Sequence, residues 1–135
     1  MATTHQAHNI SISIERDLHE VYEFTSRPEN FPLWATGLAT NLEPEGDHWV
    51  SHSPDGPVRV RFTPPNDYGV LDHHVTLPNG TEIYIPMRVM ANDSGSEVIF
   101  TLYRTPGMTE EILARDIGLV SKDLAVLKGL LEDGQ

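Results

Sequence analysis

Apolar and polar residues alternate along most of the chain, and the period of this alternation changes from one segment to the next. The first run, HNISISIE, places Ile10, Ile12 and Ile14 on one face, which predicts a half-buried strand. The segment LHEVYEFT then has a helical period, and Asp17 before it, with Glu20 three residues later, resembles a capping box. The next segment, PENFPLW, begins with a proline, which favours a second short helix.

Short alternating runs separated by turn sequences follow from residue 38 onward. Their spacing predicts an antiparallel meander of six strands, over the segments GLATNLE, HWVSHS, VRVRF, GVLDHHVTL, EIYIPMRVM and EVIFTLYR. Pro86 lies inside the fifth run, which indicates an edge position or a bulge.

The helical period returns after Pro106 and Gly107 and predicts one helix over residues 109–131, with Thr109 as its N-cap. The apolar stripe of this helix consists of Leu113, Ile117, Val120, Leu124, Leu127 and Leu131. One face of the sheet must be covered, and only this helix is long enough to cover it. The predicted fold is therefore α+β. A curved antiparallel seven-stranded sheet surrounds a long C-terminal helix, with two short helices after the first strand, in a helix-grip arrangement.

Several segments of the chain resemble one known superfamily. The segment ISIERDLHEVYEFTSRPENFPLW resembles the opening of START-like (SRPBCC) proteins of the polyketide cyclase/dehydrase type. VLDHHVTL, PMRVMANDSGSEVIFTLYRTPGM and DLAVLKGLLE resemble the later part of small bacterial members. The resemblance implies that residues 1–135 form one such domain, with a deep cavity between sheet and helix for a small apolar or aromatic molecule. The superfamily has no common catalytic set, so none is carried over.

The run GVLDHHVTL contains three adjacent polar residues, Asp72, His73 and His74. Side chains alternate between the faces of a strand, so His73 shares the inner face with Leu71 and Val75, while Asp72 and His74 point outward. The two histidines therefore cannot converge on one metal, and no metal site is expected. His73 is the one titratable group of the inner wall. It is either a core residue with satisfied nitrogens or a group that orients a ligand or carries a proton.

The same alternation indicates which residues line the cavity. The expected ligand-binding residues are Trp34, Phe62, His73, Ile85, Phe100 and Gly118. Trp34 follows the short helices, where the cavity of START-like proteins usually opens, so it is either a core anchor or an aromatic wall. Gly118 belongs to a second helical stripe of small residues, Ala114, Gly118, Ser121 and Ala125. That stripe would either leave volume for a ligand or permit close packing of helix and sheet.

Composition excludes several classes of function. Lys plus Arg number 9 and Asp plus Glu number 20, which gives a formal charge of −11 and disfavours nucleic acid and anionic membrane surfaces as partners. The absence of cysteine excludes disulfides and thiolate chemistry. No signal peptide or membrane span is recognisable, so a cytoplasmic location is expected. No cofactor is expected.

Three functional interpretations remain open. The first is binding of a small apolar or aromatic molecule, and the second is a cyclase- or dehydratase-like enzyme that uses His73 as acid or base. The third is an interaction module that works through the outer face of the sheet. That face mixes charges with apolar residues, which also makes it a possible homodimer surface, namely Val70, Tyr84, Met90, Ile99 and Tyr103.

Overall fold

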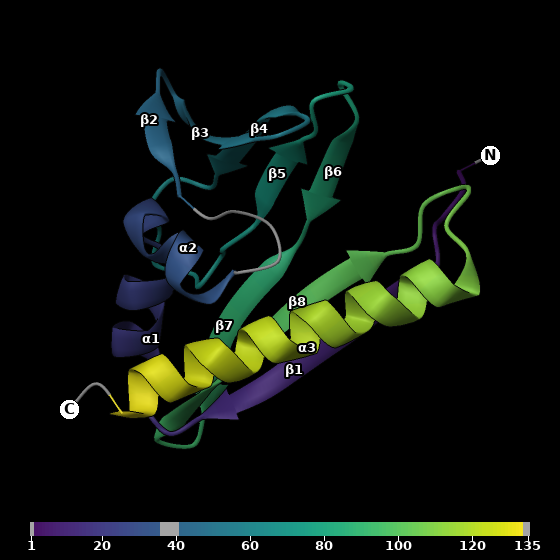
Figure 1. Ribbon diagram of the computed structural model, residues 1–135. Helices are drawn as coiled ribbons and strands as arrows, with labels where there is room; N and C mark the ends of the chain where they lie inside the picture. Colours follow the sequence, from purple (N-terminus) through teal and green to yellow (C-terminus); the bar gives the residue numbers. More distant parts are fainter. Residues whose placement is uncertain (1, 36–40, 134–135) are drawn as a thin grey trace.

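The computed structural model describes residues 2–35 and 41–133. An N-terminal strand is followed by short helices, a run of antiparallel strands and one long helix (Figure 1). The elements are β1 (Ala7–Ile14), α1 (Leu18–Thr25), the 3₁₀ helix η1 (Pro28–Asn30), α2 (Phe31–Trp34), β2 (Glu43–Glu45), β3 (His48–Ser53), β4 (Gly56–Phe62), β5 (His73–Thr76), β6 (Glu82–Ile85), β7 (Met87–Asn92), β8 (Gly95–Tyr103) and α3 (Glu110–Asp133). This order confirms the predicted α+β architecture.

The strands form two hydrogen-bonded groups rather than one seven-stranded sheet. β1, β8 and β7 are neighbours in one group, and β2 to β6 follow one another in the other. The predicted strand count is wrong because the run EIYIPMRVM divides at Pro86, which has no N–H group for a strand ladder. The Pro86 carbonyl still accepts a hydrogen bond from the Thr101 N–H of β8, at 2.9 Å. The chain therefore passes from one group of strands to the other while it remains hydrogen-bonded to β8.

One other predicted strand is shorter than expected, and another lies mostly outside the described residues. Within GVLDHHVTL only His73–Thr76 is a strand, and Val70 makes an isolated bridge to Arg88. This bridge joins the segment before β5 to β7, and so links the two groups. The strand expected over residues 37–43 lies mostly outside the described residues, and the structure places β2 at Glu43–Glu45.

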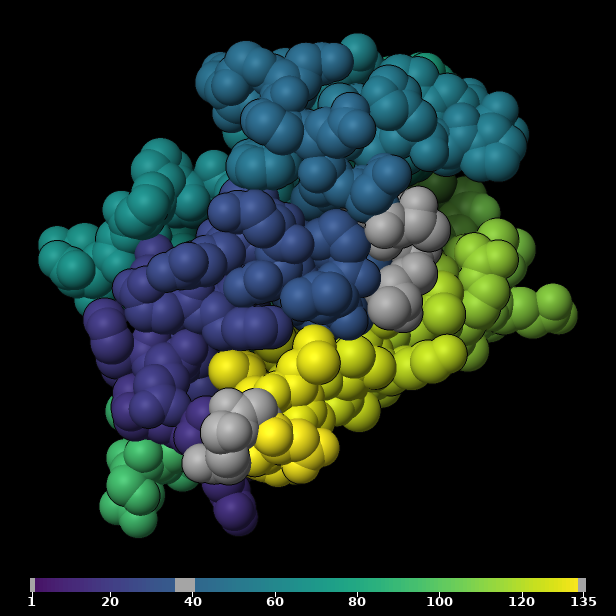
Figure 2. Space-filling view, turned by 60° about the vertical axis from the view of Figure 1, so that its left-hand side comes forward, coloured from purple at the N-terminus to yellow at the C-terminus, as the bar shows by residue number. Residues whose placement is uncertain are grey.

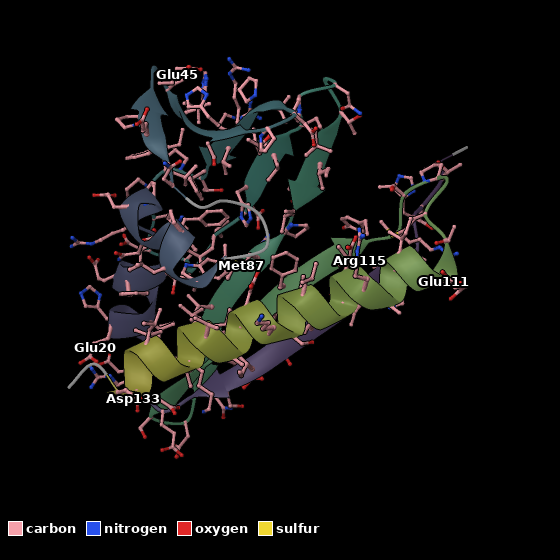
Figure 3. All side chains as sticks on the ribbon, in the orientation of Figure 1. Glu20, Glu45, Met87, Glu111, Arg115 and Asp133 are labelled. Carbon is pink, nitrogen blue, oxygen red and sulfur yellow. The ribbon has the colours of Figure 1, made fainter. Side chains whose placement is uncertain are left out.

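Capping side chains begin both longer helices, as the sequence indicates. The Asp17 side chain accepts a hydrogen bond from the Glu20 N–H at 3.0 Å, at the start of α1. Thr109 Oγ1 accepts from the Ile112 N–H at 3.1 Å, at the start of α3. Glu111 and Asp133 mark the two ends of α3 in Figure 3. No helix in the described ranges is both long and apolar enough to span a membrane.

The core lies between α3 and the sheet. α3 packs against β1 and β8, and α2 packs against α3 (Figures 1 and 2). The predicted apolar stripe of α3 faces inward. Leu113, Leu124, Leu127 and Leu131 are buried, and Ile117 and Val120 are half-buried. A second, smaller cluster lies inside the five-stranded group and consists of Val58, Val60, Val75 and Ile85.

Candidate functional site

His73 lies on the inner face of β5, enclosed by aromatic rings. Its side chain is 2% exposed. Its ring centroid lies 5.5 Å from that of Phe31, 5.8 Å from that of Phe62 and 6.4 Å from that of Phe100. These rings come from α2, β4 and β8, so His73 stands where the two groups of strands meet the short helix.

The hydrogen bonding of His73 determines which ring nitrogen carries the proton. Nδ1 lies 3.1 Å from the Leu71 carbonyl oxygen, which can only accept a hydrogen bond. Nδ1 therefore donates, and Nε2 of the neutral ring is an acceptor. Burial lowers the pKa of His73 from 6.5 to about 4, against a smaller opposing effect of the Leu71 hydrogen bond. Near neutral pH the inner wall therefore carries an uncharged imidazole with a free lone pair.

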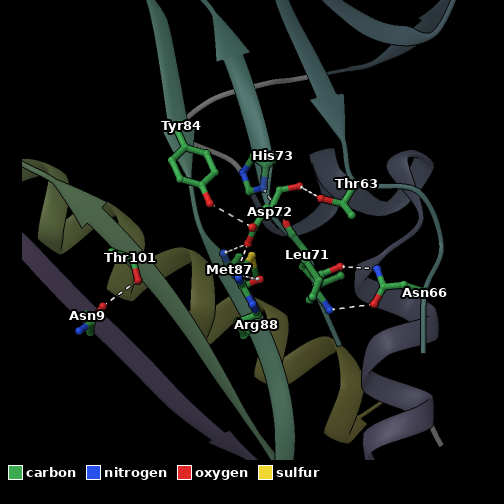
Figure 4. Close-up of polar contacts among 11 residues, drawn as sticks. Asn9, Thr63, Asn66, Leu71, Asp72, His73, Tyr84, Met87, Arg88 and Thr101 are labelled. Atoms are coloured by element: carbon green, nitrogen blue, oxygen red, sulfur yellow. Dashed lines mark hydrogen bonds and ion pairs between the residues drawn. The ribbon is translucent and has the colours of Figure 1, made fainter. Parts of the chain in front are cut away.

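The neighbours of His73 in sequence face the other way, which confirms the predicted register. Asp72 accepts hydrogen bonds from the Met87 N–H at 2.8 Å and the Tyr84 hydroxyl at 3.1 Å, and it pairs with Arg88 (Figure 4). His74 stacks on Tyr84, with 4.9 Å between the ring centroids. One strand thus separates a charged outer network from an apolar inner wall.

A pocket of about 190 Å³ opens between His73 and α3. Its described wall consists of Phe31, Trp34, Ala35, His73, Ile85, Phe100, Leu102, Asp116, Leu119, Val120 and Asp123. Apolar side chains form most of this wall. The two carboxylates come from α3, whereas the imidazole comes from β5.

A much smaller chamber adjoins the pocket through shared wall residues. It has a volume of about 10 Å³ and is lined by Thr25, Ser26, Phe31, Trp34, Phe62, Thr63, Leu71, His73 and Met87. Phe31, Trp34 and His73 line both spaces. Among the described residues, two polar atoms of the chamber residues are buried without a hydrogen-bond partner, Thr25 Oγ1 and Trp34 Nε1.

The structure brings most of the sequence-predicted site residues together. Trp34, His73, Ile85 and Phe100 line the pocket, and Phe62 lines the chamber. Whether they bind a ligand remains a prediction. Trp34 is 2% exposed, so it is both a buried anchor and part of the wall.

The expectation for Gly118 is wrong, because this residue is exposed and does not line the pocket. The small residues of α3 each follow a core residue by one position, which turns them about 100° away from the sheet. Asp116, Leu119 and Asp123 each precede a core residue by one position, so they lie on the opposite flank, where the pocket is.

Sequence reasoning missed several residues of the wall. Phe31 contacts Trp34, Phe62 and His73 edge to face or nearly so, with centroids 5.2 to 5.5 Å apart. Its signal was present in PENFPLW, which places an apolar ring three residues before Trp34. Leu119 and the two α3 carboxylates have no comparable signal, because an exposed helix flank normally has such a composition. Across the described ranges, no group of three or more His, Asp or Glu side chains could hold a metal ion.

Comparison with solved structures shows the same architecture in other proteins. The chain matches DynU16, from the dynemicin biosynthetic locus, with a TM-score of 0.72 and 15% identity over 96% of the chain and 48% of that protein. It matches the Aha1 dimer from Colwellia psychrerythraea with a TM-score of 0.72 and 17% identity, over 96% of the chain and 98% of that protein. The chain has the helix-grip fold of the START-like superfamily.

The resemblance found in the sequence is thus confirmed at the level of the START-like fold. No family model matches the sequence. Among curated proteins, Colossin-B of Dictyostelium discoideum is 27% identical over 93% of the chain, but the chain spans only 3% of that protein's length. At these identities the comparisons establish the START-like fold, and the residues of the site must supply the argument for function.

Proposed function

We propose that the protein binds a small apolar or aromatic molecule in the pocket between His73 and α3. The observation that supports this is the pocket itself, with a volume of about 190 Å³ and walls of Phe31, Trp34, Ile85 and Phe100. Ligand sites are typically concave and apolar with a few polar groups that set orientation. His73 supplies such a group, because its Nε2 accepts a hydrogen bond while Nδ1 is held by Leu71.

We place binding ahead of catalysis because His73 is a poor proton carrier at neutral pH. General acid–base catalysis works best when the pKa lies near the working pH, whereas burial lowers the pKa of His73 to about 4. The described wall of the pocket also contains no serine, threonine, lysine or tyrosine that could act as a nucleophile. An orienting role needs only the lone pair of the neutral ring.

The binding proposal is tested with a matched pair of variants on α3. Val120→Trp places an indole in the pocket, because Val120 lines it. Gly118→Leu adds a side chain to the opposite, exposed flank, where no atom of the described residues lies within 4 Å of the added Cβ, apart from the two adjacent residues and the nearby helix backbone. With naphthalene as the probe in a thermal-shift or NMR titration, the parent and Gly118→Leu should bind, and Val120→Trp should not.

Native mass spectrometry of the purified protein would complement this titration by detecting any retained molecule. Circular dichroism must first establish that both variants are folded. Naphthalene binding that survives in folded Val120→Trp would place the ligand elsewhere and contradict the proposal. Loss of binding in both variants would instead point to a general effect on α3.

We also propose that the outer sheet face is a homodimer surface. Tyr84 is 43% exposed and Met90 is 45% exposed, and both lie on the outer face of their strands. A related observation is that one protein of similar fold, Aha1, was solved as a dimer. Sedimentation at high micromolar concentration tests the proposal, and a monomer there would reject it. If the parent is a dimer, Met90→Lys should weaken it.

A further inference from the structure

We infer that the small chamber behind the pocket is a hydroxyl subsite, so the ligand class is a ring that carries a hydroxyl group. This inference rests on the proposed binding function and specifies its ligand. It starts from two buried polar atoms without a partner, Thr25 Oγ1 and Trp34 Nε1, in residues that are 6% and 2% exposed. Leaving such atoms unpaired is costly, so natural proteins almost always supply a partner.

The volume of the chamber limits what that partner is. A volume of about 10 Å³ is room for one oxygen atom with its hydrogens and no more. Both unpaired atoms belong to residues of the chamber wall. A single water or a single hydroxyl group therefore fits, and a carboxylate or a ring does not.

The chemistry of the wall favours an occupant that accepts one hydrogen bond and is able to donate another. The indole Nε1–H of Trp34 can only donate, so the occupant must accept. Thr25 Oγ1 can take either role. A hydroxyl group meets these requirements through one oxygen atom.

Continuity with the pocket connects the subsite to the ligand. Phe31, Trp34 and His73 line both spaces, so a ring in the pocket lies beside the chamber. We expect a water in the chamber when the pocket is empty. A hydroxyl on the ligand ring takes the place of that water and reproduces its hydrogen bonds, while the ring itself stays among the apolar side chains.

Three probes that share one ring system test the inference on the parent protein. Naphthol should bind about tenfold more tightly than naphthalene, as expected for one well-placed buried hydrogen-bonding group. Methoxynaphthalene should lose this advantage, because the methyl ether cannot donate and does not fit the chamber. Isothermal titration calorimetry measures all three.

Matched variants assign the preference to the chamber. Trp34→Phe keeps a ring and removes the N–H, and should reduce the preference for naphthol over naphthalene to less than about threefold. Trp49→Phe makes the same change on β3, away from both spaces, and should leave the preference intact. Thr25→Val, which keeps shape and removes the hydroxyl, provides a second measurement should Trp34→Phe fail to fold, and should also lower the preference.

The outcomes separate this inference from the proposed function. Naphthalene binding in the pocket without a preference for naphthol overturns the hydroxyl subsite and leaves the proposed function standing. A preference that persists in folded Trp34→Phe and Thr25→Val also overturns it. Failure of both naphthalene and naphthol to bind the folded parent overturns both proposals.

Discussion

The two groups of strands bury their inner faces in different ways. The group of β1, β8 and β7 lies under α3, and its cluster includes twelve buried residues among those described, from Ile14 to Leu131. The cluster of the five-stranded group has four, Val58, Val60, Val75 and Ile85. The inner face of this second group meets α2 instead, through Phe31 and Phe62, whose ring centroids lie 5.2 Å apart.

This difference accounts for the position of the pocket. α3 packs along β1 and β8, and the chain passes from the five-stranded group to the other group at Pro86. His73 and Ile85 come from the five-stranded group, and Phe100 and Leu102 come from β8. The pocket therefore lies at the seam, where the helix-covered core ends and the smaller cluster begins.

The largest expected effect is on the helix-covered group. Leu127 on α3 is 0% exposed, so Leu127→Ala should lower the free energy of unfolding by about 2–5 kcal/mol, through lost burial and the cavity left behind. Leu130 on the same helix is 38% exposed, and Leu130→Ala should change stability by no more than about 0.5 kcal/mol. Chemical denaturation measures both, and similar losses in the two variants would mean that α3 is not seated as described.

Acid should destabilise the seam through His73. The folded pKa is about 4 and the ordinary value is 6.5, so between these pH values the unfolded chain binds the proton and the folded protein does not. The free energy of unfolding should therefore fall by about 3 kcal/mol from this group as the pH is lowered from 6.5 to 4. The contribution is constant only from about one pH unit above 6.5, where the unfolded histidine is also deprotonated.

Carboxylates titrate in the same range, so a difference between variants isolates the effect of His73. His73→Leu has no imidazole there, and its loss of stability on acidification should be smaller than that of the parent. Equal curves for the parent and His73→Leu would show that the imidazole is not desolvated in the folded state.

An identical substitution in the two clusters tests whether they are separately stable. Val60 and Val98 are both 0% exposed, the first in the smaller cluster and the second in the larger. Each Val→Ala change should cost about 1.5 kcal/mol, from two lost carbons at about 0.8 kcal/mol each. Val60→Ala should speed amide hydrogen exchange about tenfold in β4 and β5 while β8 stays protected. Uniform acceleration in both variants would show that the two groups unfold as one unit.

The inward faces of the strands and the core stripe of α3 were largely predictable from the sequence. Alternation predicted the inward side chains of the strands, and His73 is buried as that pattern requires, with Asp72 and His74 outside. The apolar stripe of α3 was predictable for the same reason, because one strong periodic signal covers more than five turns. A long periodic segment shows from its own pattern which of its faces is buried, even when the element that packs against that face is unknown.

The seam was not predictable in the same way. The division of one apparent strand at Pro86 depends on how two groups of strands curve around a helix, which a local pattern does not contain. The chamber depends on how Thr25 of α1 and Trp34 of α2 are placed relative to each other, at a scale of one oxygen atom. For α3, the sequence pattern identified the core stripe but could not tell which of its flanks would face the pocket.

The smallest effect concerns the flank of α3 that was misassigned. Gly118 is exposed on a helix, and a Cβ built there meets no atom within 4 Å. Gly118→Ala should therefore raise the free energy of unfolding by about 0.5–1 kcal/mol, because alanine loses less conformational freedom in a helix than glycine does. Naphthalene affinity should not change, since the pocket lies on the other flank. If α3 instead covered both groups of strands, this flank would face the sheet, and Gly118→Ala would destabilise the protein by overpacking. Thermal denaturation of this variant measures the change in stability, and calorimetry measures the naphthalene affinity. The two results decide between a helix that covers one group of strands and a helix that covers both.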